Sequence, residues 1–300
     1  MGRDYFLDKD ALVDKQGNIY FVFTNYNPPG YVFAYLKYVY TSRGLWKGYE
    51  RILPYYGVKR LVKLPQRFEY EPCYGVTYPV VYLSEVKEHL RPEEGLEKIV
   101  HESPKDKATE ALIDFIYAYD IDVRNAGVTG SLLLGIAHEN SDVDLVIYGD
   151  KSTEDFLHSF PGFQRDDDWV LETSRNYGLS LEVAKRLYNN KTRGIYKGVK
   201  FSVLFVHEKP RRHCEMVCRQ AGEIETKGTV YGDVKALYYP SLAVLQAEKE
   251  YEVISFEGIF SSVMYGARKV SVKGALMQCD DKEVIVVGDR KVGGYVAPDM

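Results

Sequence analysis

Two aspartates occupy alternate positions of an apolar segment near the middle of the chain. Asp142 and Asp144 are interleaved with Val143 and Leu145, a pattern typical of a half-buried β-strand. Residues two apart in a strand lie on the same face, about 7 Å apart, so the two carboxylates share a face. Paired carboxylates repel each other unless a cation lies between them, and Mg²⁺ prefers oxygen ligands together with substrate phosphates. The pair therefore predicts a Mg²⁺ site.

A Gly-Ser pair precedes these aspartates. Gly130 and Ser131 stand where an expected strand, residues 123–128, gives way to the start of a short helix. Glycine lets a phosphate approach the backbone, the first N–H groups of a helix attract anions, and the Ser131 hydroxyl can donate to a phosphate oxygen. The alternative is that Ser131 only caps the helix. In the first interpretation, a phosphate-binding turn lies beside two metal-binding carboxylates.

The order of strand, Gly-Ser, helix, spacer and Asp-hydrophobic-Asp resembles the signature of the polymerase-beta-like nucleotidyltransferase superfamily. The matching residues are Gly130, Ser131, Gly135, Ser141, Asp142 and Asp144. The resemblance covers residues 108–206, about a third of the chain. The layout of the whole chain also resembles a group of uncharacterised archaeal predicted nucleotidyltransferases.

The resemblance implies a mixed β-sheet backed by helices, and Mg²⁺-dependent transfer of a nucleotidyl group from an NTP to an acceptor hydroxyl. The acceptor would belong to an RNA, a protein or a small molecule. Gly130 and Ser131 would bind the nucleotide, and Asp142 and Asp144 would be the catalytic residues and the Mg²⁺ ligands. Two metal ions about 4 Å apart would stabilise the attacking and leaving oxygens of an in-line displacement.

A third carboxylate usually follows on a later strand in this superfamily. The counterpart here is the segment 200–206, where Phe201, Val203 and Phe205 are expected to face the core and Ser202 takes the place of the acid. A neutral hydroxyl is a poor base and a weak Mg²⁺ ligand. Either another acid substitutes, or one metal is missing, or the domain binds nucleotides without transferring them. Whether the protein is an enzyme stays open at this point.

Other charged residues are candidates for supporting roles. The candidate substitutes for the third acid are Asp166, Asp167, Asp168, Glu172 and Glu208. The three-aspartate run can also be read as a solvated loop. Arg193 and Lys200 could bind the nucleotide by neutralising triphosphate charge, or they could simply belong to a charged hairpin.

Two functions from other classes compete with transfer. One is a catalytically lapsed nucleotidyltransferase fold that serves as a nucleotide- or RNA-binding module. The other is a metal-free scaffold in a larger assembly. Hydrolase and P-loop motifs are absent from the sequence.

The strands and helices expected along the chain, which must position the candidate site residues, indicate an α+β protein in three parts. A β-rich N-terminal module (1–100) contains strands at 17–26 and 30–40, and a nucleotidyltransferase-like core (101–222) follows. Residues 223–300 contain closely spaced strands that predict a small, OB-like β-barrel.

Several helices and one hairpin are expected within these parts. The core should contain helices near 104–120, after Ser152 with a capping box to Asp155, and near 180–190. Residues 193–206 read as a hairpin that turns at Lys197. Further helices are expected after Ser84 and in the second half of 209–222.

A basic stretch borders the expected barrel. Residues 209–213 are compatible with RNA binding along the nucleic-acid backbone. Tyr231, Tyr238 and Tyr239 could stack on bases, or they could be packing residues of the barrel.

The amino-acid composition indicates a globular protein whose net charge does not attract polyanions. Of 300 residues, 45% are hydrophobic, and 39 basic and 43 acidic residues leave a net charge of −4. No segment approaches the roughly 20 apolar residues of a membrane span, so no membrane partner is expected. The cysteines are Cys73, Cys214, Cys218 and Cys279. Their scatter favours buried thiols over a zinc site or a disulfide, and hence a reduced, cytoplasmic protein.

Overall fold

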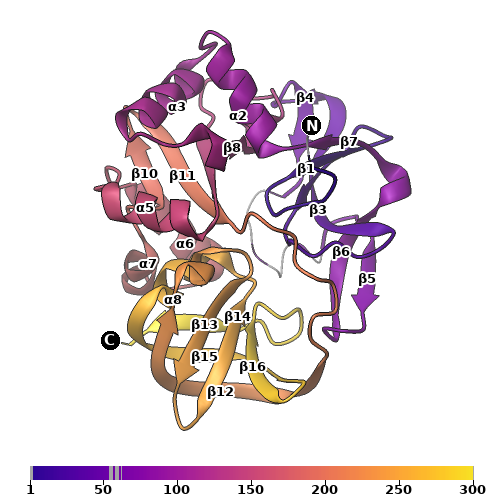
Figure 1. The fold of residues 1–300 in the computed structure, drawn as a ribbon, viewed down its shortest axis with the longest axis vertical. Helices are drawn as coiled ribbons and strands as arrows, with labels where there is room; N and C mark the ends of the chain where they lie inside the picture. Colours follow the sequence, from indigo (N-terminus) through magenta and orange to yellow (C-terminus); the bar gives the residue numbers. More distant parts are fainter. Residues whose placement is uncertain (1–2, 54–56, 58–60, 62, 300) are drawn as a thin grey trace.

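The computed structural model describes residues 3–53, 57, 61 and 63–299, and arranges them around three β-sheets (Figure 1). An antiparallel N-terminal sheet is followed by a central mixed sheet with helices and then by a C-terminal barrel. The expected α+β class is therefore confirmed. The boundaries at residues 100 and 222 stay a prediction.

The N-terminal sheet has seven strands within the described residues. They are β1 (Ala11–Asp14), β2 (Ile19–Val22), β3 (Tyr31–Gly44), β4 (Gly48–Arg51), β5 (Phe68–Glu71), β6 (Val76–Tyr82) and β7 (Val86–Leu90). The order is β5-β6-β3-β2-β1-β7, with β4 paired to β3. The helix expected after Ser84 is wrong, because this residue lies in a 3-10 turn that leads into β7. Pro92 instead begins a helix, where its missing N–H leaves no hydrogen bond unmade.

The central sheet is mixed, as predicted. Its strands are β8 (Ala126–Thr129), β9 (Val143–Tyr148), β10 (Arg193–Tyr196) and β11 (Val199–Val206), in the order β10-β11-β9-β8. The pair β9 and β11 is parallel, and the other pairs are antiparallel. Its helices are α2 (Pro92–His101), α3 (Lys107–Ala118), α4 (Gly130–Leu133), α5 (Asp150–Ser159), α6 (Asp167–Tyr177) and α7 (Leu181–Leu187).

Local expectations in this region hold in part. The β10–β11 hairpin turns at Lys197 and Gly198, both with positive φ, as predicted. The helix after residue 149 is present, but the capping box from Ser152 to Asp155 is wrong. That helix starts at Asp150, so Ser152 already lies inside its first turn.

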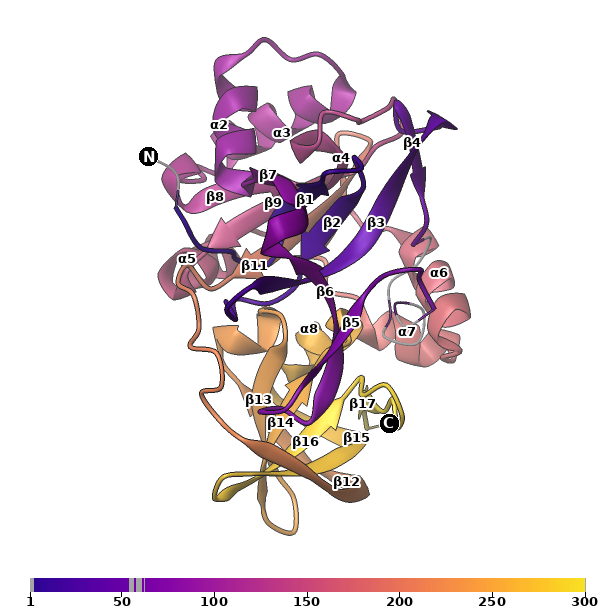
Figure 2. The same ribbon diagram turned by 90° about the vertical axis from the view of Figure 1, so that its right-hand side faces the viewer.

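Both faces of the central sheet carry buried apolar residues. One face, which carries Leu145 and Phe201, packs against α3 and α5. The opposite face carries Val146 and Val206, and packs against Leu7 in the segment that precedes β1. Figure 2 shows the N-terminal sheet lying across the central sheet on this second side. The N-terminal sheet thus covers a face of the central sheet that helices leave open.

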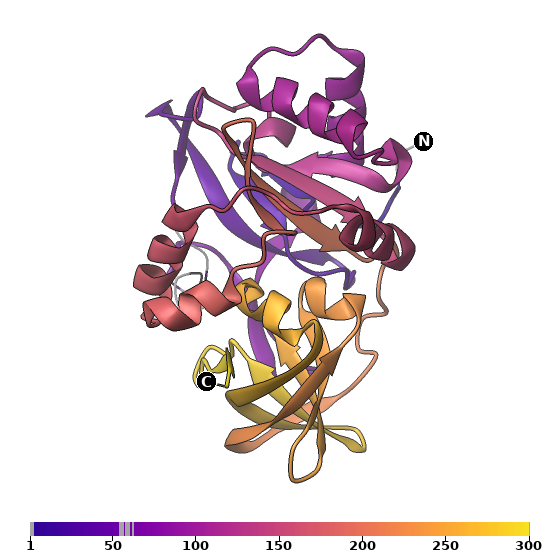
Figure 3. The same cartoon turned by 90° about the vertical axis from the view of Figure 1, so that its left-hand side faces the viewer.

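The C-terminal part is a closed barrel at one end of the molecule (Figure 3). Its strands are β12 (Cys218–Gly232), β13 (Ser241–Gln246), β14 (Glu250–Ser255), β15 (Gly266–Cys279) and β16 (Lys282–Val287), with β17 (Tyr295–Pro298) added to β15. Pairing of β12 with β15 closes the ring, and β14 pairs with β16 in parallel. The small OB-like barrel is confirmed. The helix expected within 209–222 is wrong, since β12 already begins at Cys218.

All four cysteines form disulfides, so the prediction of buried thiols is wrong. Cys73 is bonded to Cys214, and Cys218 to Cys279. Cys218 and Cys279 are register partners on β12 and β15. The cysteines consequently give no argument for a reducing compartment. Among the described residues, no helix has the length and apolarity needed to cross a bilayer.

Candidate functional site

The backbone at Gly130 lies directly against the carboxylate of Asp144. Gly130 has a φ of +67°, and a Cβ atom built on it would lie 2.5 Å from Oδ2 of Asp144. Thr129 is the register partner of Asp144 in the β8–β9 pair, which brings the turn and the carboxylate together. A side chain at position 130 would therefore collide with Asp144 and would strain the backbone. The turn and the aspartate occupy the same side of the sheet.

Ser131 follows in the first turn of α4 and is buried. The residue that precedes α4 is Thr129, so Ser131 is inside the helix and is not its N-cap. The interpretation of Ser131 as a capping residue is wrong.

Asp144 lies on the face of β9 that is directed away from the helices, whereas Asp142, expected in the same strand, immediately precedes that strand. Val143 and Leu145 between and after them belong to the core beneath α3 and α5. Asp142 is exposed and Asp144 is partly buried. Burial, and then the negative charge of Asp142, raise the pKa of Asp144 to about 6. A carboxyl group whose ionisation is opposed by burial and by a neighbouring carboxylate is a suitable ligand for a divalent cation.

Ser202 lies beside Asp144, at the position where the third acid was sought. The two residues are register partners in the parallel β9–β11 pair, and Arg193 is the register partner of Ser202 on β10. Phe201 and Val203 face the core on the other side, as predicted. Across the sheet, Asp144 on β9 is therefore followed by Ser202 on β11 and then by Arg193 on β10.

The proposed substitutes for the third acid lie at the start of α6, within α6, or beyond the end of β11. Asp166 is buried, accepts a hydrogen bond from the backbone of Trp169 and pairs with Lys200 at 3.4 Å. The acidic run is thus the start of α6, and the solvated-loop interpretation of it is wrong. Glu208 lies six residues beyond Ser202, roughly 20 Å along the strand direction.

The remaining two candidates, Asp167 and Glu172, are exposed on α6. Asp168 pairs with Lys200 at 3.3 Å, also at the surface. Within the described chain, none of the five candidates is in register with Asp144.

Three cationic side chains surround Asp144, and two of them come from the N-terminal sheet. Lys37, Arg51 and Arg193 all oppose the rise in the Asp144 pKa. Lys37 lies on β3, is only 4% exposed, and its Nζ is 4.5 Å from the ring centroid of Phe21. Sequence reasoning missed Lys37 and Arg51. The available signal was a single lysine inside a strongly apolar strand, an environment that a charged residue rarely occupies without a partner.

Arg193, on β10, also interacts with the charge of Asp144. Its guanidinium lies 4.7 Å from the ring centroid of Trp169, and burial lowers its pKa while Asp144 opposes this shift. Lys200 is exposed and instead pairs with Asp166 and Asp168. The structure therefore brings one of the two predicted cations to the aspartates and leaves the other at the edge.

The β3–β4 hairpin holds the loop between Gly130 and Asp142 in place. Lys47 Nζ donates to the carbonyl oxygen of Gly135 at 2.6 Å, and the rings of Trp46 and His138 lie 5.7 Å apart. Ile136 of this loop is buried in a cluster with residues of the N-terminal sheet. The same hairpin carries the strands of Lys37 and Arg51, so it positions both the loop and the cations.

The expected RNA-contacting aromatics are mostly packing residues. Tyr238 is buried and donates to Asp150, and the hydroxyl of Tyr239 donates to the carbonyl oxygen of Phe256. Tyr231 remains exposed at 46%. Arg211, in the basic stretch, lies over the ring of Tyr26.

Comparison with known proteins supports the nucleotidyltransferase resemblance. Residues 115–206 match the family model described as "Nucleotidyltransferase domain". This range contains Gly130, Asp142, Asp144, Arg193 and Ser202.

A curated relative, "Uncharacterized protein MJ1086" of the archaeon Methanocaldococcus jannaschii, is 26% identical over 185 residues. The match covers 55% of this chain and 54% of that protein, so the chain spans about half the length of the curated relative it matches. No solved structure matches the chain.

Proposed function

We propose that the nucleotidyltransferase domain of this chain transfers a nucleotidyl group from an NTP to an acceptor hydroxyl in a Mg²⁺-dependent reaction. The observation that carries the proposal is the contact between the Gly130 backbone and the Asp144 carboxylate. A phosphate held at this turn would lie next to a metal-binding side chain. The acceptor would be the hydroxyl of an RNA, a protein or a small molecule.

Asp142 and Asp144 would hold the Mg²⁺. Burial, and then the charge of Asp142, raise the pKa of Asp144 despite the nearby cations, and a bound divalent cation would favour its ionised form. Carboxylate oxygens in this arrangement suit a divalent cation that also binds phosphate. The bound metal would neutralise charge on the transferring phosphoryl group.

The triphosphate would be held by Gly130, Ser131 and Arg193, together with Lys37 and Arg51. Charge-assisted hydrogen bonds from guanidinium groups to phosphate oxygens are among the stronger polar contacts in proteins. Cations fixed in a partly buried site also stabilise the negative charge that develops on the leaving pyrophosphate. Lys200 pairs with Asp166 and Asp168 and is exposed, so it would attract the triphosphate only weakly through solvent. The N-terminal module would accordingly be part of the active site.

The direct test measures incorporation of labelled nucleotide from each NTP into candidate acceptors, with and without Mg²⁺. We expect Mg²⁺-dependent incorporation that falls at least about 100-fold in Asp144→Asn, a loss typical of removing one electrostatic group from an active site. Asp155→Asn, which changes an exposed acid on α5, is the matched control and should retain full activity. Activity unchanged in Asp144→Asn would refute the assigned site.

Ser202 favours a second candidate function, a lapsed nucleotidyltransferase fold that binds nucleotide or RNA. A hydroxyl beside Asp144 cannot serve as the third carboxylate. This alternative predicts NTP binding by calorimetry without turnover, and a gain of turnover in Ser202→Asp. Turnover by the wild-type protein would exclude it.

A further inference from the structure

A second cluster of metal-binding side chains lies where the N-terminal sheet meets the barrel. Glu71 ends β5, and His213 and Cys214 belong to the connection that leads into β12. One potential ligand atom from each of these three residues lies within 4.8 Å of the others. Cys73, two residues after Glu71, is bonded to Cys214 in the structure. One carboxylate, one imidazole and one sulfur therefore meet at this junction, and a second sulfur, that of Cys73, is bonded to the first.

The distances in the cluster are close to those of a tetrahedral metal site. Sγ of Cys214 lies 3.6 Å from Nδ1 and 3.8 Å from Nε2 of His213, and 3.9 Å from Oε1 of Glu71. Around a tetrahedral zinc ion, with Zn–S of about 2.3 Å and Zn–N or Zn–O of about 2.0–2.1 Å, such atoms are roughly 3.5–3.6 Å apart. Shifts of a few tenths of an ångström would bring the Cys214, His213 and Glu71 atoms to that geometry. The Cys73 sulfur is bonded to that of Cys214, and after reduction it would have to move away from it by about 2 Å, from a disulfide bond of about 2.05 Å to the roughly 3.8 Å between two zinc-bound thiolates.

Glu71 is an unusual residue to find at this depth. Its carboxylate is 1% exposed and accepts hydrogen bonds from His213, from the hydroxyl of Tyr31 and from the backbone of Cys73. Although burial opposes them, these bonds hold the pKa of Glu71 below its usual range. A buried ionised carboxylate requires a positively charged or hydrogen-bonding partner.

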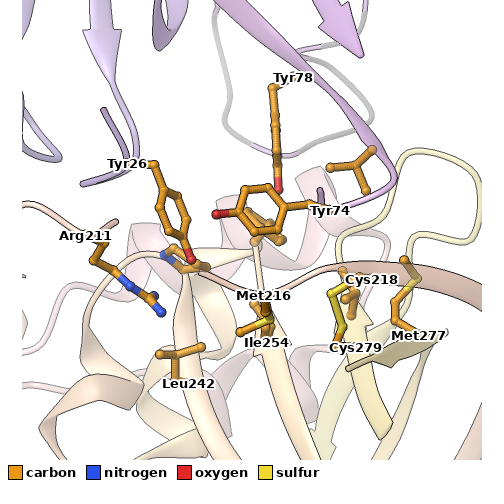
Figure 4. A pocket seen from close by; sticks show the side chains of 14 residues that line it. Tyr26, Tyr74, Tyr78, Arg211, Met216, Cys218, Leu242, Ile254, Met277 and Cys279 are labelled. Atoms are coloured by element: carbon orange, nitrogen blue, oxygen red, sulfur yellow. A yellow bond between two sulfur atoms is a disulfide. The ribbon is translucent and has the colours of Figure 1, made fainter. Parts of the chain in front are cut away.

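Aromatic side chains enclose the cluster. The rings of Tyr74 and Phe33 lie 6.3 and 6.4 Å from that of His213, and the Tyr74 hydroxyl accepts a hydrogen bond from the backbone of Cys214. Figure 4 shows Tyr74 in the lining of the adjacent pocket, with Tyr26 and Arg211 beside it. An enclosing apolar shell of this kind orients ligands and limits access of water.

We propose that Cys73, Cys214, His213 and Glu71 form a zinc-type divalent metal site when the Cys73–Cys214 disulfide is reduced. Reduction to two thiols takes two electrons and two protons. A dithiol supplies both and becomes a disulfide, whereas a phosphine supplies the electrons, water supplies the protons and the phosphine becomes its oxide. Each thiol then loses its proton as its sulfur binds the metal. His213 contributes a neutral nitrogen and Glu71 an ionised oxygen. Disulfide and metal are thus alternative links between the N-terminal sheet and the barrel.

The second disulfide provides an internal control. Cys218 and Cys279 link two strands of one barrel, and in the described part of the chain they belong to no group of potential metal ligands. Reduction of this pair should create no metal site.

The test is a Co²⁺ titration of the metal-free full-length chain, reduced with a phosphine. We expect one equivalent to produce a thiolate-to-cobalt charge-transfer band and the visible bands of tetrahedral Co²⁺. Both should disappear when a disulfide oxidant removes two electrons and restores the Cys73–Cys214 bond. Cobalt bound at Asp142 and Asp144 gives no thiolate band, so the outcome is independent of the proposed function.

Variants decide between the ligands. His213→Ala and the more conservative His213→Gln should weaken cobalt binding at least tenfold, and Cys214→Ser should abolish the thiolate band. Cys279→Ser should leave both unchanged, and circular dichroism would confirm that each variant folds. The proposal is overturned if the reduced wild-type protein gives no thiolate band, or if His213→Gln, Cys214→Ser and Cys279→Ser all bind cobalt as the wild-type protein does.

Discussion

The N-terminal sheet joins the rest of the molecule in two different ways. Against the central sheet it presents Lys37 and Arg51 to Asp144, and no covalent bond crosses this contact among the described residues. Against the barrel it is tied by the Cys73–Cys214 disulfide within an aromatic cluster. The charged junction with the central sheet suits a site that a polyanion must enter and leave. The covalent junction with the barrel suits a contact that stays fixed. The two junctions should therefore respond to different perturbations.

The largest effect is expected at the covalent junction. The double variant Cys73→Ser/Cys214→Ser, metal-free and under oxidising conditions, should lose about 5 kcal/mol of unfolding free energy, because the disulfide closes a loop with a separation of 141 residues. Cys218→Ser/Cys279→Ser, with a separation of 61, should lose about 4 kcal/mol. Urea unfolding measures both losses. NTP affinity should not change in either variant, and a tenfold change would show that the junctions are coupled.

A smaller but specific effect is expected at the phosphate-binding turn. Gly130→Ala should weaken NTP binding by about 100-fold, since the new methyl group would lie 2.5 Å from Asp144 Oδ2 and displace phosphate contacts that contribute about 1.5–3 kcal/mol each. Gly135→Ala is a matched control, because Gly135 has a similar φ of +64° but no atom within 4 Å of the added carbon. Calorimetry with an NTP measures both variants. Equal losses would mean that backbone strain alone is responsible.

The cations of the N-terminal sheet should contribute less individually. Lys37→Met should weaken NTP binding by about 10- to 30-fold, the value of one or two charge-assisted hydrogen bonds, while largely preserving the apolar packing of the side chain. Lys87→Met, which removes an exposed lysine from the same sheet, should have no effect on NTP affinity. If the two variants bind NTP equally well, the N-terminal module does not contribute to the site.

The smallest effect is expected at the edge of the site. Lys200→Met should change NTP affinity less than about threefold, because exposed ion pairs and screened charges contribute little. Arg193→Met should reduce NTP affinity clearly more than Lys200→Met, because Arg193 interacts with the charge of Asp144 although it lies two strands away. The reverse order would show that the nucleotide binds along the Lys200 side.

Local signals explain which parts of the fold were predictable. The order of Gly130, Ser131, Asp142 and Asp144 fixes a strand, a turn and a second strand within a short stretch, and the strand alternation around Ser202 identifies its outward direction. The barrel was predicted from closely spaced alternating segments, for the same reason. These patterns are set by neighbours along the chain.

Contacts between distant segments explain the errors. Cys73 and Cys214 are 141 residues apart, and no local pattern indicates that they meet. The 209–222 segment contains residues with helical propensity, yet its second half becomes a barrel strand because Cys218 pairs with Cys279. Lys37 reaches Asp144 only through the packing of two separate sheets. Its role in the site therefore required the three-dimensional arrangement.

The second apolar face of the central sheet limits how far the domain can be shortened. A fragment restricted to residues 115–206 would expose Val146 and Val206 to water, because the Leu7 segment that covers them would be absent. Such a fragment would also lack α2, whose Leu96 is fully buried in the helical core. We therefore expect it to aggregate when expressed alone, and work on this domain should retain the preceding hundred residues.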